Sequence, residues 1–193
     1  MVLTLRVLEI LPTREAVQQD QMEEMAKQKQ RDDGRKVGEI KAIEQYLAKN
    51  NIKAQQTKSG VFCEIQNLGT GPKADSGKIV SINYTGYSMD GKFFDSNVDS
   101  NKQLQKHPLT PFEFMAGMQG AITGMLEGIT VFNEGGKGRL FIPSVLGYGA
   151  QGSPPAIKPY ENLIFEIEVT SVKDAPQQQG MPQMPMPQQA PGR

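Results

Sequence analysis

The stretch of sequence that decides the fold is residues 79–96, IVSINYTGYSMDGKFFDS. Residues 79–87 are rich in Ile, Val, Thr and Tyr, which favour the pleated surface of a strand. The four residues MDGK at 89–92 then supply a turn, because aspartate followed by glycine suits the positive φ angles of a short hairpin connection. Phe93 starts the return strand. The stretch therefore predicts an antiparallel β-hairpin.

Working outward from the hairpin, we predict a domain of many strands and one short helix. In residues 60–68, Val61, Cys63 and Ile65 alternate onto one face of a strand. The other predicted elements are strands at 111–116, 139–142 and 162–172 and a short helix at 121–128. Such a mixture indicates the α+β class, with an antiparallel β-sheet wrapped around the helix.

A long helical arm is predicted to precede this domain. Residues 14–50 are mostly Glu, Gln, Met, Ala and Lys, which are strong helix formers, and Asn50-Asn51 suits a helix C-terminus. Gly34 and Gly38 each weaken a helix by about 1 kcal/mol relative to alanine, so we expect a break or bend within residues 31–38.

An apolar stripe on the second half of the arm recurs at helical spacing and must be buried: Val37, Ile40, Ile43 and Leu47. It can dock on its own domain or pair with a second copy of the chain, and we expect a homodimer through the helical arm. The first half of the arm is too polar to be buried. It is either a solvated linker or a partner-binding surface.

The chain divides into four predicted parts: a short strand at 1–12, the helical arm at 13–55, the compact domain at 56–174 and a tail at 175–193. The tail consists of Pro, Gln, Met and Gly repeats, which cannot bury enough apolar surface to fold, so we expect disorder. The apolar alternation of residues 3–10 matches that of residues 165–172. The first strand is either an ordinary edge strand or the closing strand of an upstream domain in a longer protein.

Composition excludes several classes of function. Lys+Arg and Asp+Glu number 21 each, so the formal net charge is zero, which argues against nucleic acid as a partner. One cysteine, Cys63, excludes an internal disulfide, and with one histidine, His107, it excludes a Cys/His zinc site. We expect Cys63 to be a buried structural thiol and His107 an exposed loop residue. The sequence therefore offers few side chains for conventional acid–base catalysis or for metal chemistry.

Six ordered motifs carry a resemblance to a known family: YTG at 84–86, DGKFFDS at 90–96, PFEF at 111–114, GAI at 120–122, GYG at 147–149 and LIFEI at 163–167. In this order and spacing, residues 60–174 resemble the FKBP-type peptidyl-prolyl cis/trans isomerases. The helical arm before the domain resembles the layout of the macrophage infectivity potentiator subgroup, whose members are dimeric bacterial envelope proteins.

The resemblance implies a proline pocket, and it assigns roles residue by residue. The walls would be Tyr84, Phe94, Phe112 and Phe165, the floor Met125, and one side Ala121 and Ile122, with the Ile122 N–H binding a substrate carbonyl. Asp95 would act from the pocket edge, the Tyr148 hydroxyl would bind another substrate carbonyl, and Ile157 would cover the rim. Phe114 fits either core or rim.

A pocket of this kind suits a reaction that breaks no covalent bond. Rotation about an amide has a barrier of about 18–20 kcal/mol because of its partial double-bond character. The twisted amide has lost that conjugation and is less polar, so a dry apolar pocket favours it over the planar ground state. Aromatic side chains serve such catalysis better than acids and bases do.

Some residues depart from the family pattern. Met125 stands where the family often has tryptophan, the loop at 97–110 is longer than in the minimal member, and Ser153 and Ala156 are small. Met125 leaves open the alternative of a non-catalytic peptide-binding module. In a third alternative, the helical arm carries the main function of the protein and the domain contributes little to it.

The resemblance also implies partners and a compartment. Proline-containing polypeptides are the expected substrates and macrolide immunosuppressants the expected ligands, with no cofactor and no metal. The location would be the periplasm or cell envelope, or the cytoplasm if Met1 is the true start.

Overall fold

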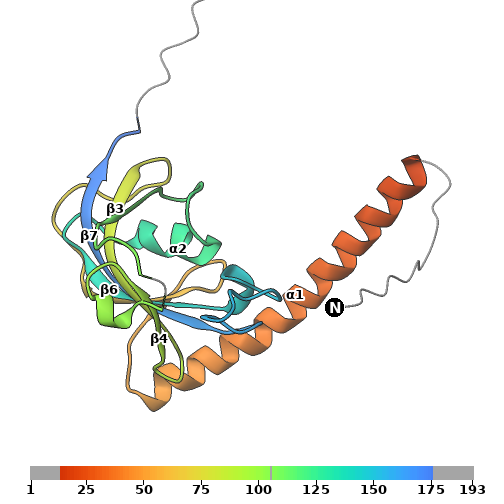
Figure 1. The fold of residues 1–193 in the computed structure, drawn as a ribbon, viewed down its shortest axis with the longest axis horizontal. Helices are drawn as coiled ribbons and strands as arrows, with labels where there is room; N and C mark the ends of the chain where they lie inside the picture. The colour runs from red at the N-terminus through yellow and green to blue at the C-terminus, as the bar shows by residue number, and fades with distance from the viewer. Residues whose placement is uncertain (1–13, 105, 176–193) are drawn as a thin grey trace, which may run out of the picture.

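The computed structural model describes residues 14–104 and 106–175. The predicted strand at 1–12 and nearly all of the predicted tail lie outside these residues. Within them, an antiparallel sheet curls around a short helix, and a long helix crosses the back of the sheet (Figure 1). The predicted α+β class, with an antiparallel sheet, one short helix and a preceding long helix, is confirmed.

The sheet has the strand order β1-β2-β6-β7-β3-β4, and β5 pairs with β3. Every pairing is antiparallel. The strands are β1 (Gln55–Gln56), β2 (Phe62–Asn67), β3 (Ile79–Ser88), β4 (Phe93–Ser96), β5 (Phe112–Met115), β6 (Lys137–Ile142) and β7 (Leu163–Lys173). The 3-10 turns are η1 (Ser100–Lys102), η2 (Ile129–Val131) and η3 (Ser144–Leu146).

The predicted hairpin of β3 and β4 is present, and local chemistry fixes its turn. The N–H of Ser88 donates to the carbonyl of Lys92 at 3.0 Å, and Gly91 has φ 84°. Asp90 accepts from the Ser88 hydroxyl and, at 3.3 Å, from the Lys92 N–H. The aspartate–glycine turn therefore forms as predicted, and it places Phe94 and Asp95 on the strand next to that of Tyr84.

The short helix α2 (Thr123–Gly128) lies in the concave face of the sheet (Figure 1). Gly124 makes the close approach possible, because a Cβ there would lie 2.3 Å from Ile142 Cγ2 on β6. Fully buried side chains fill the space between helix and sheet: Val80, Ile82, Ile129, Phe132, Leu140 and Ile142. This core holds one side of α2 against the sheet and leaves its other side for the site.

The long helix α1 (Arg14–Lys49) is continuous, so the predicted break within residues 31–38 is wrong. Gly34 and Gly38 are exposed, and nothing lies within 4 Å of a Cβ at either position. Two glycine penalties of about 1 kcal/mol each are offset by strong helix formers on both sides. The C-terminus follows the prediction: Asn51 has φ 55°, and the N–H of Ile52 donates to the Leu47 carbonyl at 2.9 Å, which closes a Schellman motif.

The second half of α1 packs on the convex face of its own sheet. Ile43 and Leu47 form a cluster with Phe62, Phe141 and Ile164. The expectation that this stripe pairs with a second chain is therefore wrong for these residues.

Two further side chains depart from the predicted pattern because of how the sheet and α1 are placed. Val37 was predicted to belong to the stripe, but it is 70% exposed. Ile65 was predicted on the buried face with Val61 and Cys63, but it is exposed where β2 leaves the core. In β2, residues on both faces are buried near its start, since Phe62 lies under α1 and Cys63 faces the main core.

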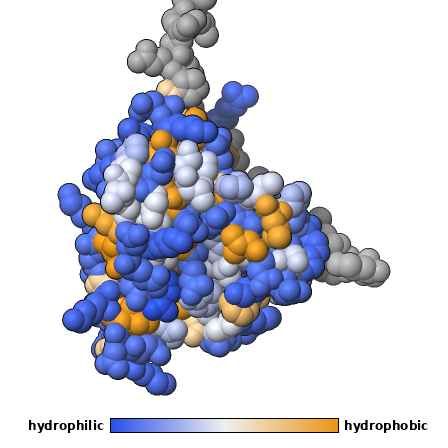
Figure 2. All heavy atoms as spheres, turned by 90° about the vertical axis from the view of Figure 1, so that its left-hand side faces the viewer, coloured by the Kyte–Doolittle hydropathy of each residue, from blue (hydrophilic) through white to orange (hydrophobic). Residues whose placement is uncertain are grey.

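The first half of α1 projects away from the domain (Figure 1). Its apolar side chains are exposed, with Met22 at 71% and Met25 at 73%. No helix in the described part of the chain is both long enough and apolar enough to cross a membrane. The face drawn in Figure 2 is largely hydrophilic, with apolar side chains gathered in small separate patches.

Candidate functional site

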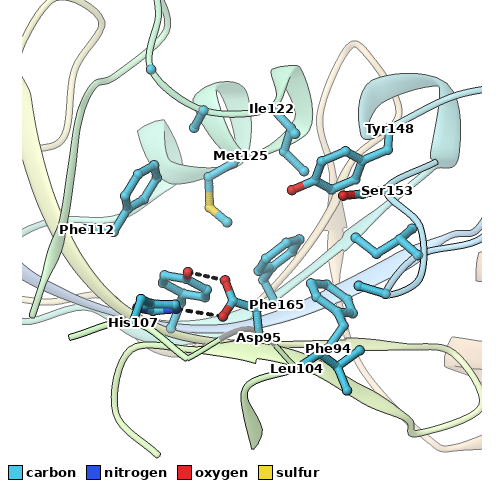
Figure 3. Close-up of a pocket in the computed structure, with 15 residues that line it drawn as sticks. Phe94, Asp95, Leu104, His107, Phe112, Ile122, Met125, Tyr148, Ser153 and Phe165 are labelled. Carbon is cyan, nitrogen blue, oxygen red and sulfur yellow. Dashed lines mark hydrogen bonds and ion pairs between the residues drawn. The ribbon is translucent and has the colours of Figure 1, made fainter. Parts of the chain in front are cut away.

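A cleft of about 450 Å³ opens between α2, the strands β3, β4, β5 and β7, and the segment after η3. It is lined by Tyr84, Phe94, Asp95, Leu104, His107, Phe112, Gly120, Ala121, Ile122, Met125, Tyr148, Ser153, Ala156, Ile157 and Phe165. All ten residues singled out from the sequence are among them. Figure 3 shows Met125 pointing from α2 toward Phe165, with Phe112 and Tyr148 on opposite sides of the opening.

Aromatic rings in edge-on and tilted contacts form the walls. The ring of Phe165 on β7 lies 5.6 Å from that of Phe94 and 6.1 Å from that of Tyr84, and Phe112 lies 6.0 Å from Tyr84. Gly86 pairs with Phe165 across β3 and β7. A Cβ at Gly86 would come within 2.5 Å of the Phe94 ring, so the missing side chain makes room for this packing. Phe114 is buried and packs behind Phe112, which places it in the core.

The helix α2 supplies the bottom of the cleft. Met125 is 3% exposed, belongs to the main core cluster and also lines the cleft. Ile122 is the residue before the helix, with extended backbone angles, and its carbonyl accepts from the N–H of Met125 at 2.9 Å. Among the hydrogen bonds of the described residues, none uses the Ile122 N–H. This leaves a backbone donor at the edge of an apolar floor.

One carboxylate lies at the cleft edge, and three groups donate to it. Asp95 accepts from the Tyr84 hydroxyl at 2.5 Å and from the Ser96 N–H at 2.9 Å, and Nε2 of His107 lies 2.8 Å from Oδ1 (Figure 3). Burial, and next the hydrogen bond to Asp95, raises the pKa of Tyr84. The tyrosine is therefore a neutral donor at physiological pH, and it donates to a carboxylate that is not deeply buried.

The expected exposed loop histidine is confirmed for His107, but the residue also belongs to the cleft, which the sequence did not predict. Its side chain is 37% exposed, but it lies against Asp95 and lines the cleft together with Leu104 of the same loop. One feature of the sequence could have indicated that Leu104 and His107 lie at the cleft. The loop at 97–110 is unusually long, so part of it must pack against the rest of the domain. Its path depends on tertiary contacts that no local pattern encodes.

Tyr148 and Ile157 come from the segment after η3. The carbonyl of Ser144 accepts from the N–H groups of Gly147 and Gly149, at 2.9 and 2.8 Å, and Gly149 has φ 54°. This tight turn presents Tyr148, which is 38% exposed, at the cleft. Burial, and next the charge of Asp95, raises the pKa of Tyr148. Its hydroxyl is thus a neutral hydrogen-bond donor facing the carboxylate side of the cleft.

The helix α1 contacts the same segment from behind. Glu39 is buried, and its carboxylate accepts from the Ser144 hydroxyl at 2.5 Å and from the Val145 N–H at 3.3 Å. The Arg35 guanidinium lies 3.6 Å from the centre of the Tyr160 ring. The arm therefore supports the turn that carries Tyr148.

Cys63 takes no part in the cleft. It is 1% exposed in the main core, and burial raises the pKa of its thiol to about 12. The expected buried structural thiol is confirmed. No group of three or more His, Cys, Asp and Glu side chains that could hold a metal ion occurs within 14–104 and 106–175.

Comparison with known proteins identifies the family of the domain that holds the cleft. The model of the family "FKBP-type peptidyl-prolyl cis-trans isomerase" matches residues 71–170. An FK506-binding protein of Neisseria meningitidis is 39% identical over 113 residues, which are 58% of this chain and 96% of that protein. FK506-binding protein 4 of Dictyostelium discoideum is 40% identical over 113 residues, but only 28% of its length is matched.

Solved structures extend the likeness to the long helix. A peptidyl-prolyl cis-trans isomerase from Pseudomonas syringae has a TM-score of 0.55 at 31% identity, covering 72% of this chain and 96% of that one. FkpA from Escherichia coli has a TM-score of 0.58 at 26% identity, covering 85% of this chain and 75% of that one. The matched domain, the shared fold and the aromatic cleft agree: this chain belongs to the family of FKBP-type peptidyl-prolyl cis-trans isomerases.

Proposed function

We propose that the cleft holds a proline ring of a polypeptide and catalyses cis/trans rotation of the Xaa-Pro amide before it, with residues 56–174 as the catalytic domain. The observation that carries this proposal is the convergence of ten sequence-predicted residues on one cleft whose walls and floor are aromatic or aliphatic. An apolar wall lowers the barrier because the twisted amide is less polar than the planar one. Each 1.36 kcal/mol of such preference gives a tenfold rate increase.

The geometry supports a division of roles. Phe94, Phe112 and Phe165 enclose the proline ring, and Met125 lies under it. The Ile122 N–H and the Tyr148 hydroxyl hold the carbonyls on either side of the proline, which fixes the substrate while one amide rotates. Asp95, held by Tyr84, faces the rotating carbonyl and acts through its field, since cis/trans rotation requires no proton transfer.

The ligands follow from the same cleft. Proline-containing segments of unfolded chains fit an open, apolar groove, and the protein therefore assists folding steps that await proline isomerisation. We also propose that macrolides of the FK506 type bind here, since relatives are named for binding FK506.

The test is a protease-free isomerisation assay, by magnetisation exchange on a Leu-Pro peptide, with the whole chain. The whole chain is used because α1 covers the apolar side chains of Phe62, Phe141 and Ile164. Cis/trans exchange should accelerate in proportion to protein at micromolar concentration. Peptide binding without acceleration would favour the alternative, a non-catalytic binding module.

We also propose a homodimer through the arm, but with contacts between other residues than those predicted from the sequence. The stripe of Ile43 and Leu47 is used within the chain, whereas Met22 and Met25 are exposed on the projecting half. Sedimentation at micromolar concentration should give twice the mass of one chain, and a variant with Met22→Glu and Met25→Glu should sediment as a monomer. A wild-type monomer would remove this part of the proposal.

A further inference from the structure

The loop between β4 and β5, residues 97–111, is pinned at its ends and reaches the cleft in its middle. Asn97 donates from its amide to the carbonyls of Ile82 and Thr110, both at 2.9 Å, and its amide oxygen accepts from the Tyr84 N–H at 2.6 Å. Between these anchors, Leu104 and His107 form one side of the cleft. The contact that joins this side to the rest of the site is that between His107 and Asp95, at 2.8 Å.

The imidazole of His107 lies between two hydrogen-bond acceptors. Nε2 is 2.8 Å from Asp95 Oδ1, and Nδ1 is 3.0 Å from the carbonyl oxygen of Pro108. An ionised carboxylate and a carbonyl oxygen can only accept, so each ring nitrogen needs a hydrogen. A neutral imidazole carries one hydrogen and the imidazolium carries two. The arrangement is therefore fully satisfied only by the protonated ring.

Other polar groups near the ring do not change this requirement. The Gln103 amide nitrogen is 3.3 Å from Nε2, but its two hydrogens have carbonyl acceptors, that of Ser96 at 2.6 Å and that of His107 at 3.3 Å. On the strands and on the segment after η3, the ionisable groups facing Asp95 are the hydroxyls of Tyr84 and Tyr148, and both pKa values are raised, so both stay neutral.

The charged side chains of the loop itself point to other partners. Asp99 accepts from the Asn101 N–H, Lys102 Nζ lies 4.7 Å from the centre of the Phe93 ring, and Lys106 Nζ contacts the Ser100 carbonyl. Asp95 is thus the acid that faces His107 from a neighbouring element. The proton on His107 is the variable charge at this edge of the cleft.

We propose that His107 is a proton-dependent positioning residue, whose imidazolium ties the β4–β5 loop to Asp95 and so holds the side of the cleft formed by Leu104 and His107 closed on the substrate. This inference rests on the proposed function of the cleft. Loss of the proton removes one of the two hydrogen bonds and the ion pair, and the side wall loosens. The effect falls on substrate affinity more than on the rotation step, because the wall encloses the planar and twisted amides alike.

The direction of the pH response follows from the contact. The hydrogen bond to Asp95, and next that to the Pro108 carbonyl, raises the pKa of His107 above its ordinary value. A raised pKa means that the contact contributes fully below the pKa of an unfolded-chain histidine and is lost as the pH rises through the higher folded value. Affinity for a Leu-Pro peptide should therefore fall by about threefold or more between about pH 5.5 and about pH 8.5.

The experiment begins with the ring itself. His107 is the one histidine of the chain, so the imidazole signals in a nuclear magnetic resonance titration belong to it alone. The wild-type ring should titrate above an ordinary histidine, and Asp95→Asn should lower its pKa. An unchanged His107 pKa in the Asp95→Asn protein would overturn the proposal.

The second measurement is peptide affinity against pH, read from resonance shifts so that it needs no turnover. Wild type should show the fall in affinity, and His107→Gln, which cannot titrate, should give a flat profile with intact folding. Identical profiles for the two proteins would overturn the proposal. If peptide affinity follows His107 while cis/trans exchange is not accelerated, the positioning role stands and the proposed catalysis fails.

Discussion

Asp95 is the one carboxylate among the residues that line the cleft, and its neighbours explain how a charge is kept beside aromatic rings. It is a third exposed and accepts from Tyr84, Ser96 and His107. Donors of this kind stabilise the ionised form without deep burial. A fixed carboxylate can then act on the rotating amide through its field while the rest of the cleft stays apolar.

The first residue-scale prediction concerns the tyrosine that holds Asp95. Tyr84→Phe removes the 2.5 Å hydrogen bond and leaves the ring packing in place. We expect kcat/KM for a Leu-Pro peptide to fall about fivefold, since a hydrogen bond to a charged group is lost where the carboxylate must be held. Tyr87→Phe is the matched control, because its hydroxyl bonds Glu166 outside the cleft. A loss below twofold for Tyr84→Phe would refute the proposed role of the pair.

The second residue-scale prediction concerns the floor. Met125→Trp should tighten binding of FK506 about threefold, because a rigid ring loses less side-chain freedom than methionine when a ligand lands on it. Met118→Trp is the control, since Met118 is 61% exposed and does not line the cleft. Affinity should be measured by titration calorimetry, with folding checked by circular dichroism. Unchanged or weaker affinity in a folded Met125→Trp protein would show that Met125 is not the floor.

The sequence predicted the cleft residues that sit on regular elements or next to glycine, and it missed those on the long loop. Phe94, Phe112 and Phe165 follow from ordered motifs whose spacing is fixed by strands and short turns. His107 lies twelve positions beyond Asp95 on a loop whose path is set by Asn97 and Gln103. Such long-range side-chain contacts leave no periodic trace in the sequence.

At the scale of elements, the second half of α1 has two roles. It closes the convex face of the sheet over Phe62 and Phe141, and through Glu39 it supports the turn that carries Tyr148. Helical periodicity predicted the buried Ile43 and Leu47 but could not name their partner. The break was wrongly predicted because glycine propensity is a weak local preference that flanking helix formers and docking override.

The prediction at this scale tests that docking. Ile43 is fully buried under the sheet, so Ile43→Ala should lower the free energy of unfolding by about 2–5 kcal/mol. Val37→Ala lies six residues earlier on the same helix at a position 70% exposed, and should change it by about 0.5 kcal/mol or less. Urea unfolding of the whole chain measures both. Equal, small effects would mean that α1 is not docked in solution.

For the whole molecule, the architecture separates a packed domain that holds the cleft from a projecting arm. The sheet, α2 and the second half of α1 form one packed body with the cleft on its concave side, and the first half of α1 extends away from it (Figure 1). The α+β class and the positions of most strands along the chain followed from the sequence because hairpins and alternation are local signals. The strand order in the sheet, with β7 between β6 and β3, depends on packing that only the structure displays.

The most direct measurement of the central claim compares two phenylalanines in the protease-free exchange assay. Phe112 is 36% exposed and lines the cleft, whereas Phe93 is 41% exposed and packs on Tyr87 outside it. Since the two are similarly exposed, their truncation should cost the fold similar amounts. We predict that the whole chain accelerates Leu-Pro exchange, that Phe112→Ala lowers kcat/KM about tenfold, and that Phe93→Ala changes it less than about twofold. Exchange at the uncatalysed rate, or equal losses in the two variants, would contradict catalysis by this cleft.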